Sequence, residues 1–296
     1  MKVLQIDRLN KRYKRIHAVR DLSLEIEAGS VYGILGPNGS GKTTTLGMIL
    51  DVITPDSGRY EWFEGKYGRN ARRHIGALLE TPNFYPYLHA MDNLNIIAHI
   101  KRVSKNGLED LLKQVNLWER RHSKFKTYSL GMKQRLAIAA TLVGEPQVLI
   151  FDEPTNGLDP QGIAEIRELI LQIAASGKTI FMASHILDEV EKVCSHVAII
   201  KAGKLLASGP VGSIINNDIT LELQSDNNDL LYQLLSRVPT TRMIERRGRI
   251  LVAQVAAEVT GGDINRLAFD HGILLSHLVA RKKKLEEEFL EITTKA

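Results

Sequence analysis

The chain has 296 residues, a length that allows about two domains, and its 44% hydrophobic and 25% charged content is typical of a globular protein with a real core. It contains no run of about 18 apolar residues and no secretory start, so it predicts neither a membrane-spanning helix nor a secreted protein. A single cysteine, Cys194, excludes an internal disulfide and suits a reducing cytosol. The net charge of +5 is spread along the chain, which a solvated surface explains as well as binding to nucleic acid or anionic lipid does.

The first 35 residues are predicted to form β-structure that leads into a glycine-rich loop. Polar and apolar residues alternate through Leu22–Glu27, and residues 3–6 form an earlier strand. Residues 28–30 form a turn, and the apolar run Val31–Leu35 is the strand that enters the loop. We expect Tyr13 to lie on an early loop, where its exposed ring is free either to stack on a purine or to contact nothing.

The glycine-rich loop matches the pattern G-x-x-x-x-G-K-[ST], which is typical of phosphate binding. Its residues are Gly36, Pro37, Asn38, Gly39, Ser40, Gly41, Lys42, Thr43 and Thr44. Glycines let the backbone amides converge on one point, and the helix expected at residues 45–50 adds its positive N-terminal end. We therefore predict a nucleoside triphosphate site, with Lys42 on the β- and γ-phosphates and the Thr43 hydroxyl on Mg²⁺. The alternative is a glycine-rich turn that binds nothing.

Beyond this loop the predicted elements change from strands to helices. Strands are expected at residues 57–62 and 74–79, and Glu80 follows the second. Prolines then interrupt the chain, and helical periodicity runs through three segments, at residues 91–102, 108–115 and 131–143. We interpret residues 81–143 as a helical insertion in an α/β core.

Two adjacent acids follow Gln147–Phe151, a continuous apolar run of the kind that a buried parallel strand shows. Asp152 is suited to hold the water shell of Mg²⁺, and Glu153 to orient or deprotonate an attacking water. An ordinary acidic strand-to-loop junction is the alternative. Helices and strands then alternate, which predicts an α/β fold with a mostly parallel sheet. These elements are expected at residues 161–174, 179–183, 186–193 and 197–200.

The amino-acid composition of the chain changes after about residue 213. We therefore predict two domains, at residues 1–215 and 216–296. The order expected in the second is strand, helix, strand, strand, helix, strand, which is that of a small ferredoxin-like α+β module. Its elements are expected at residues 219–223, 229–237, 241–245, 250–255, 263–270 and 273–279, with a charged helix at residues 284–291. A regulatory ligand-binding domain and a dimerisation element both fit this module.

Together these motifs resemble the ATP-binding subunits of ABC (ATP-binding cassette) transporters, over about residues 1–215. The phosphate loop and the acidic strand correspond to Walker A and Walker B of that family. The resemblance implies a P-loop ATPase core with a mostly parallel sheet, an antiparallel β subdomain and a helical insertion. It further implies that Tyr13 stacks on adenine, that Gly157, Leu158 and Asp159 form the D-loop, and that His185 contacts the γ-phosphate.

Residues 128–135 occupy the place of the LSGGQ signature of this family. Ser129 is expected to be the N-cap, and Gly131 leaves the helix N-terminus open to an anion. In the family, two subunits pack head to tail, and each ATP lies between the Walker A of one subunit and the signature of the other. The resemblance therefore implies a homodimer in the ATP-bound state, with two equivalent sites.

Two departures from the usual family pattern point to a subgroup. The signature reads Ser129-Leu130-Gly131-Met132-Lys133-Gln134, and Glu80 stands where most members have the glutamine of the Q-loop. Both resemble the bacitracin- and lantibiotic-type exporters and immunity transporters, as does the ending Leu285–Thr293. Glutamate accepts hydrogen bonds but does not donate them when ionised. Our hypothesis is that Glu80 contacts Mg²⁺ or the attacking water and relays occupancy to the membrane partner. The alternative is a solvated loop glutamate.

We therefore expect MgATP hydrolysis at the cytoplasmic face of the cell membrane, with Glu153 as general base, to power export of a peptide antibiotic or drug-like substrate. An integral-membrane subunit is expected to dock near residues 84–88, where three aromatic side chains, a proline and a leucine make an apolar surface, and core packing of the insertion is the alternative. No nucleic acid is expected. An exporter of an unrelated substrate is an alternative. A soluble ABC-type ATPase acting on DNA or translation is disfavoured, because the chain has no long coiled coil and no second cassette. The signature and His185 argue against a GTP-binding switch.

Overall fold

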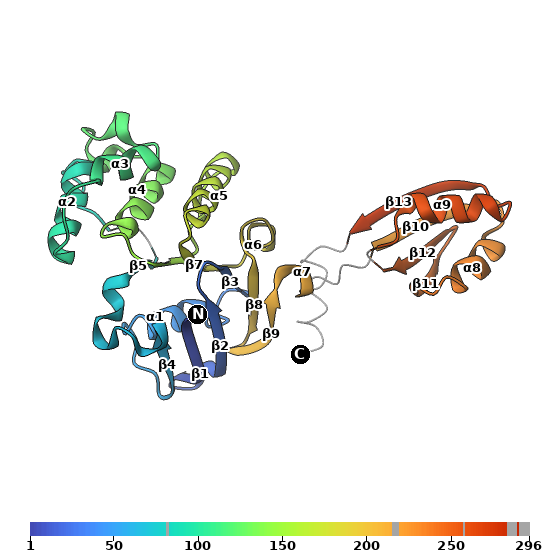
Figure 1. Ribbon diagram of the computed structural model, residues 1–296, viewed down its shortest axis with the longest axis horizontal. Helices are drawn as coiled ribbons and strands as arrows, with labels where there is room; N and C mark the ends of the chain where they lie inside the picture. Colours follow the sequence, from blue (N-terminus) through green and yellow to red (C-terminus); the bar gives the residue numbers. More distant parts are fainter. Residues whose placement is uncertain (81–82, 215–218, 257, 283–288, 290–296) are drawn as a thin grey trace. The chain divides into compact units, whose positions relative to one another are not determined.

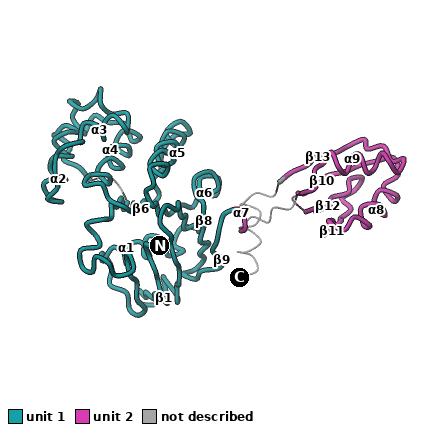
Figure 2. The backbone as a smooth tube through the Cα atoms, viewed as in Figure 1, with its two compact units in different colours: residues 1–211, 296 teal, residues 212–295 magenta. Residues whose placement is uncertain are grey.

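The computed structural model describes residues 1–80, 83–214, 219–256, 258–282 and 289. The chain divides into two compact units, Met1–Val211 and a second that begins at Gly212 (Figure 2). None of the helices within the described ranges is long and apolar enough to cross a bilayer. The charged helix expected at residues 284–291 lies outside the described residues, apart from Phe289.

A six-stranded sheet forms the centre of the first unit, in the order β5-β6-β7-β3-β8-β9 (Figure 1). Its strands are β3 (Val31–Leu35), β5 (Ile75–Leu78), β6 (Val148–Asp152), β7 (Thr179–Ser184), β8 (His196–Lys201) and β9 (Lys204–Pro210). All neighbouring pairs are parallel except β8 and β9. Every residue of β3, β6 and β7 is buried, which explains why these strands are apolar without alternation. The predicted α/β fold with a mostly parallel sheet is confirmed.

A second, antiparallel sheet of the first unit has the order β2-β1-β4. Its strands are β1 (Lys2–Tyr13), β2 (Ile16–Glu27) and β4 (Ser57–Trp62), followed by the short helices η1 (Phe63–Gly65) and η2 (Gly68–His74). Alternate residues such as Leu4, Ile6 and Leu24 are buried in one core with Leu46 of α1 (Lys42–Ile49). The expectation that Tyr13 lies on a loop is wrong, because β1 extends through this residue to the tight turn before β2.

The helical insertion consists of α2, α3 and α4, which pack against one another and form one group in Figure 1. Their bounds are α2 (Ala90–Lys101), α3 (Leu108–Gln114) and α4 (Leu130–Leu142), with the short helices η3 (Trp118–Arg120) and η4 (Phe125–Thr127) between them. The remaining helices of the first unit are α5 (Pro160–Ala175) and α6 (Leu187–Val193), and the short helix α7 (Val211–Ile214) lies at the boundary between the two units. Cys194 follows α6 and is buried, and burial raises the pKa of its thiol to about 12.

The second unit has the predicted ferredoxin-like order. Its elements are β10 (Ile219–Ser225), α8 (Asn228–Ser236), β11 (Thr241–Arg247), β12 (Ile250–Val255), α9 (Gly261–Asp270) and β13 (Leu275–Lys282). The strands form an antiparallel sheet in the order β11-β12-β10-β13. Alternate residues of β10, among them Leu221 and Leu223, are buried in one core with Leu231 of α8 and Ile264 of α9. This unit therefore has a hydrophobic core of its own.

Close approach of α4 to β5 generates a stability prediction. A Cβ on Gly76 would lie 2.1 Å from the carbonyl oxygen of Thr141 and 2.9 Å from the side chain of Leu149. We expect Gly76→Ala to lower the free energy of unfolding by about 1–3 kcal/mol, measured by urea denaturation, because the backbone of α4 must move. Gly212→Ala is the control, since an added Cβ there meets nothing within 4 Å. Equal loss in both variants would contradict the close packing.

Candidate functional site

The phosphate loop is fixed by two close backbone contacts. Gly41 has a φ of 105°, and an added Cβ would lie 2.3 Å from the carbonyl oxygen of Ala18 in β2. A Cβ on Gly36 would lie equally close, at 2.3 Å, to the carbonyl oxygen of Ile200 in β8. Both positions therefore require glycine. The left-handed Gly41 also ends the loop, so α1 begins at Lys42 and its first amides are free to bind an anion.

Lys42 is the buried cation of the site, with 5% of its surface exposed. Its ammonium donates hydrogen bonds to the carbonyl oxygens of Gly36 at 2.7 Å and Pro37 at 3.3 Å. The same Nζ lies 3.3 Å from Oε1 of Glu153. A buried cation is costly unless it is paired, and these contacts provide the pairing.

Glu153 joins Lys42 to His185. Oε2 of Glu153 lies 2.7 Å from Nδ1 of His185, and the backbone amide of His185 donates to the same oxygen at 3.4 Å. An ionised carboxylate only accepts, so Nδ1 carries a hydrogen and Nε2 is left for another partner. Glu153 has a φ of 49°, a left-handed conformation that is unfavourable for a residue with a side chain. The three side chains thus form one chain of contacts.

Asp152 lies beside this chain and is 4% exposed. Burial raises the pKa of its carboxyl, and the negative charges of Glu153 and Glu80 add to this effect. The hydrogen bond with Thr43 and the charge of Lys42 oppose it. Among the described residues, Oδ1 of Asp152 has no hydrogen-bond partner. A buried carboxylate oxygen without a partner, beside a hydroxyl, suits a divalent cation.

The signature residues belong to a second group. Ser129 is the N-cap of α4, as expected, and its hydroxyl accepts a hydrogen bond from the backbone amide of Met132 at 3.3 Å. Asp159 is the N-cap of α5, and its carboxylate accepts from the amide of Gly162 at 2.9 Å. The start of α4 contacts the D-loop, because a Cβ on Gly157 would lie 3.3 Å from Leu130 and a Cβ on Gly131 4.0 Å from Leu158. Within the described ranges, no hydrogen bond or ion pair joins this group to Lys42 or Glu153.

Tyr13 and Glu80 lie at the periphery of the site. Tyr13 is 43% exposed, and the ammonium of Lys11 lies 5.6 Å from its ring centroid. Its hairpin continues into Ala18, whose carbonyl oxygen contacts the phosphate loop. Glu80 is exposed, has a φ of 57° and acts on Asp152 through its charge.

Two residues that the sequence did not indicate are also close to the site. Glu189 of α6 is 3% exposed, and Thr155, in the loop after β6, is 4% exposed. An acid in a short helix is usually solvated, and a threonine in a loop has no distinctive pattern. Only the tertiary contacts of these side chains identify them.

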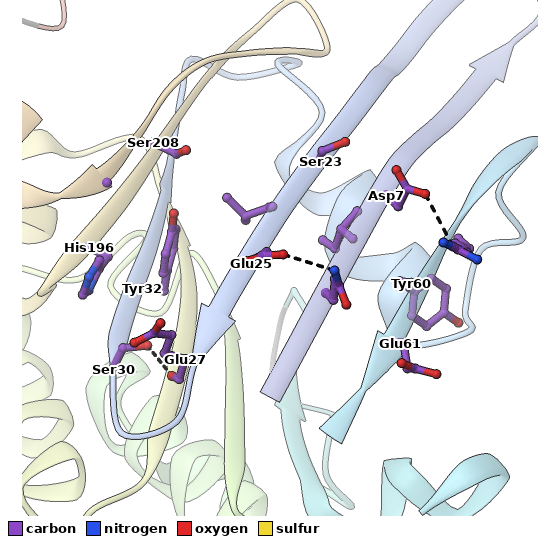
Figure 3. Close-up of a pocket in the computed structure, with 15 residues that line it drawn as sticks. Asp7, Ser23, Glu25, Glu27, Ser30, Tyr32, Tyr60, Glu61, His196 and Ser208 are labelled. Carbon is purple, nitrogen blue, oxygen red and sulfur yellow. Dashed lines mark hydrogen bonds and ion pairs between the residues drawn. The ribbon is translucent and has the colours of Figure 1, made fainter. Parts of the chain in front are cut away.

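A cavity of about 830 Å³ lies elsewhere, between the antiparallel sheet and strands β3, β8 and β9 (Figure 3). Four carboxylates line it, from Asp7, Glu25, Glu27 and Glu61. None of the residues predicted to bind a nucleotide is among its lining residues. This cavity is therefore distinct from the predicted nucleotide site.

Comparisons with known proteins agree with this geometry. The family model described as ABC transporter matches residues 19–156. The chain is similar to the bacitracin transport ATP-binding protein BcrA of Enterococcus faecalis, with 35% identity over 98% of this chain and 96% of the relative. It is 38% identical to the lantibiotic transport ATP-binding protein SrtF of Streptococcus pyogenes, over 74% and 99%. A solved structure, the dimeric post-hydrolysis state of the ATP-binding cassette MJ0796 bound to ADP and Pi, matches with a TM-score of 0.62, 26% identity and coverage of 70% and 98%.

The buried Asp152 generates a pH-dependent prediction. Its pKa is raised in the folded state, so the native state binds the proton more tightly than the unfolded state does. Above the native pKa of Asp152, the ionised carboxylate therefore lowers the free energy of unfolding. This loss of stability disappears as the pH falls below the pKa that Asp152 has in the unfolded state, about 4. We expect Asp152→Asn to raise the melting temperature at pH 7.5 in the presence of a chelator, with a smaller difference at pH 4. A pH-independent difference would contradict the electrostatic cause.

Proposed function

The chain belongs to the family of ATP-binding proteins of ABC transporters, and we propose that it binds MgATP at the phosphate loop and couples its hydrolysis to export of a peptide antibiotic or drug-like substrate. Hydrolysis of ATP coupled to transport is the activity of the family. The observation that carries the assignment of the site is the contact chain from Lys42 through Glu153 to His185. It joins a phosphate-binding cation to a carboxylate suited to activate water.

The substrate class follows from the relatives. BcrA is a bacitracin transport protein and SrtF a lantibiotic transport protein, and both are named for peptide antibiotics. The similarity to BcrA extends over nearly the whole chain, including the second unit. Cargo specificity resides mainly in the membrane subunit, so this ATPase powers export without selecting the substrate.

The chemistry at the phosphates is divided among three side chains. Lys42 and the first amides of α1 hold the phosphates, because a helix N-terminus and a buried ammonium both attract an anion. Glu153 accepts a proton from the attacking water. His185 donates through Nδ1 to Glu153, which fixes the ring and leaves Nε2 for the γ-phosphate. Tyr13 stacks on the adenine ring from the exposed end of its hairpin.

The residues around Asp152 fit the Mg²⁺ that accompanies ATP. Oδ1 of Asp152 has no other partner within the described part of the chain, and the Thr43 hydroxyl is hydrogen-bonded to the same carboxylate. Mg²⁺, when bound, neutralises charge on the phosphates. Thr43 and Asp152 would hold it, and Glu80 contributes its charge from the edge of the site.

A second copy of the chain completes each site. Ser129, Gly131 and Asp159 lie at the start of α4 and α5, and no hydrogen bond or ion pair joins them to the phosphate loop among the described residues of one chain. The helix N-terminus at Ser129 suits the phosphates of the opposite subunit. The similar cassette MJ0796 is a dimer, which supports a symmetric ATP-bound homodimer here.

An apolar groove beside α2 is where a membrane subunit docks in this proposal. The groove has a volume of about 400 Å³ and is lined by Asn83, Phe84, Tyr85, Asn93, Ile96, Ile97 and Ile100. Tyr85 is 48% and Ile100 71% exposed, which is unusual for such large apolar side chains. Docking there places the chain at the cytoplasmic face of the membrane. The relatives favour this over a soluble ATPase acting on nucleic acid.

The general-base assignment is tested by Glu153→Gln. We expect ATP hydrolysis to fall about 100-fold or more, because glutamine does not accept the proton. ATP binding should persist, and gel filtration should show a trapped ATP-bound dimer. Glu61→Gln, in the acidic cavity, is the matched control and should hydrolyse ATP normally. Hydrolysis by Glu153→Gln at the wild-type rate would refute the assignment.

The transport assignment is tested by affinity capture from detergent-solubilised native membranes, followed by mass spectrometry. We expect a polytopic membrane protein to be recovered with the wild-type chain and lost with Ile100→Asp, since a charge in the groove is unfavourable. Val52→Asp changes a similarly exposed side chain outside the groove, 70% exposed, and should retain the partner. Both variants should keep ATPase activity. If the wild-type chain is recovered only from the cytosol, without a membrane protein and with full ATPase activity, the result would instead support the soluble ATPase.

A further inference from the structure

Glu189 is a buried acid that the hydrolysis reaction described above does not use. Its Oε2 accepts a hydrogen bond from the Thr155 hydroxyl at 2.6 Å and a longer one from the Ser184 hydroxyl at 3.4 Å. All three residues are buried, with 3%, 4% and 0% exposure in that order. Burial raises the pKa of Glu189, and the two hydroxyl donors oppose this. One carboxylate oxygen thus accepts hydrogen bonds from the loop after β6 and from the end of β7.

Thr155 belongs to the turn that carries Glu153. The backbone amide of Asn156 donates to the carbonyl oxygen of Glu153 at 3.1 Å, so the chain from Glu153 to Asn156 forms one tight turn. Glu153 adopts a left-handed conformation, which persists only where surrounding contacts hold it. The hydroxyl of Thr155, anchored on Glu189, is such a contact.

Ser184 belongs to the turn that carries His185. It is the last residue of β7, and its hydroxyl oxygen accepts a hydrogen bond from the backbone amide of Ile186 at 3.0 Å. This hydrogen bond links the residue before His185 to the residue after it. Because the same hydroxyl donates to Glu189, the turn around His185 is tied to α6.

We propose that Glu189 is a positioning residue, which holds the turn of Glu153 and the turn of His185 in register so that these two side chains meet. The distance that it maintains is the 2.7 Å between Oε2 of Glu153 and Nδ1 of His185. This inference rests on the proposed part of both residues in ATP hydrolysis. Misplacement of a reacting group by about 1 Å lowers a rate by up to about 100-fold.

The test compares pairs of variants in the full chain. Thr155→Val removes the donor and keeps the volume, whereas Thr155→Ser keeps the hydroxyl. We expect the valine variant to lose about tenfold or more in kcat with KM for ATP changed less than about twofold, and the serine variant to stay within about threefold of wild type. Glu189→Ala should behave like the valine variant, and Glu189→Gln, which keeps an acceptor oxygen, like the serine variant.

Thr179→Val separates positioning from folding. Thr179 is 2% exposed at the opposite end of β7, where its hydroxyl oxygen accepts from the amide of Gly29 at 2.9 Å. We expect this control to lower the melting temperature as much as Thr155→Val does, with kcat unchanged. Wild-type kcat in Thr155→Val, or equal kcat in its valine and serine variants, overturns the proposal. If Glu153→Gln abolishes hydrolysis while Thr155→Val keeps the wild-type kcat, only the positioning inference fails. Hydrolysis by Glu153→Gln at the wild-type rate refutes the assignment on which it rests.

Discussion

The site depends on the parallel register of three neighbouring strands, β6, β7 and β3. Asp152 lies opposite Ala183, and Leu35 lies opposite Ser184, so the three strands end at the same level. Parallel strands bring their carboxyl ends to one edge of the sheet, where ligands of open α/β sheets bind. For this reason the phosphate loop, the acidic pair and His185 meet, although they are far apart in the sequence. No single loop supplies the site, and its precision comes from the sheet.

The second constraint is electrostatic. Lys42 is paired with Glu153, and its charge also acts on Asp152. Burial raises the pKa of Asp152 and of Glu189, and the charge of Glu153 raises both further. Negative charge therefore exceeds positive charge where a triphosphate is expected. Such a balance favours a nucleotide that carries a divalent cation over a bare one. Among the described residues, buried oxygens of Asp152, Glu153 and Glu189 have no hydrogen-bond partner, which agrees with this charge balance.

The sequence predicted most of the elements, because the buried strands Val31–Leu35 and 147–151 are continuous apolar runs and the loop glycines have a strict spacing. Two errors have local causes. The start of α1 was placed at residue 45, three residues late, because the effect of a left-handed Gly41 is not visible in a periodicity. Strand β9 was missed because it is a half-exposed edge strand that contains glycine and proline. Glu189 was not predicted as a site residue, since its burial arises from contacts with residues distant in the chain.

The ends of the second unit have a consequence for its history. Ile219, the first residue of β10, pairs with Lys282, the last residue of β13. Both chain ends of this antiparallel sheet therefore leave the module at one point, on adjacent strands. A module with neighbouring ends is readily gained, lost or exchanged, because only one short junction has to be compatible with the host. Recombination is thus a simple route by which an ATPase core acquires such a module, and the core keeps its own hydrophobic interior when it does.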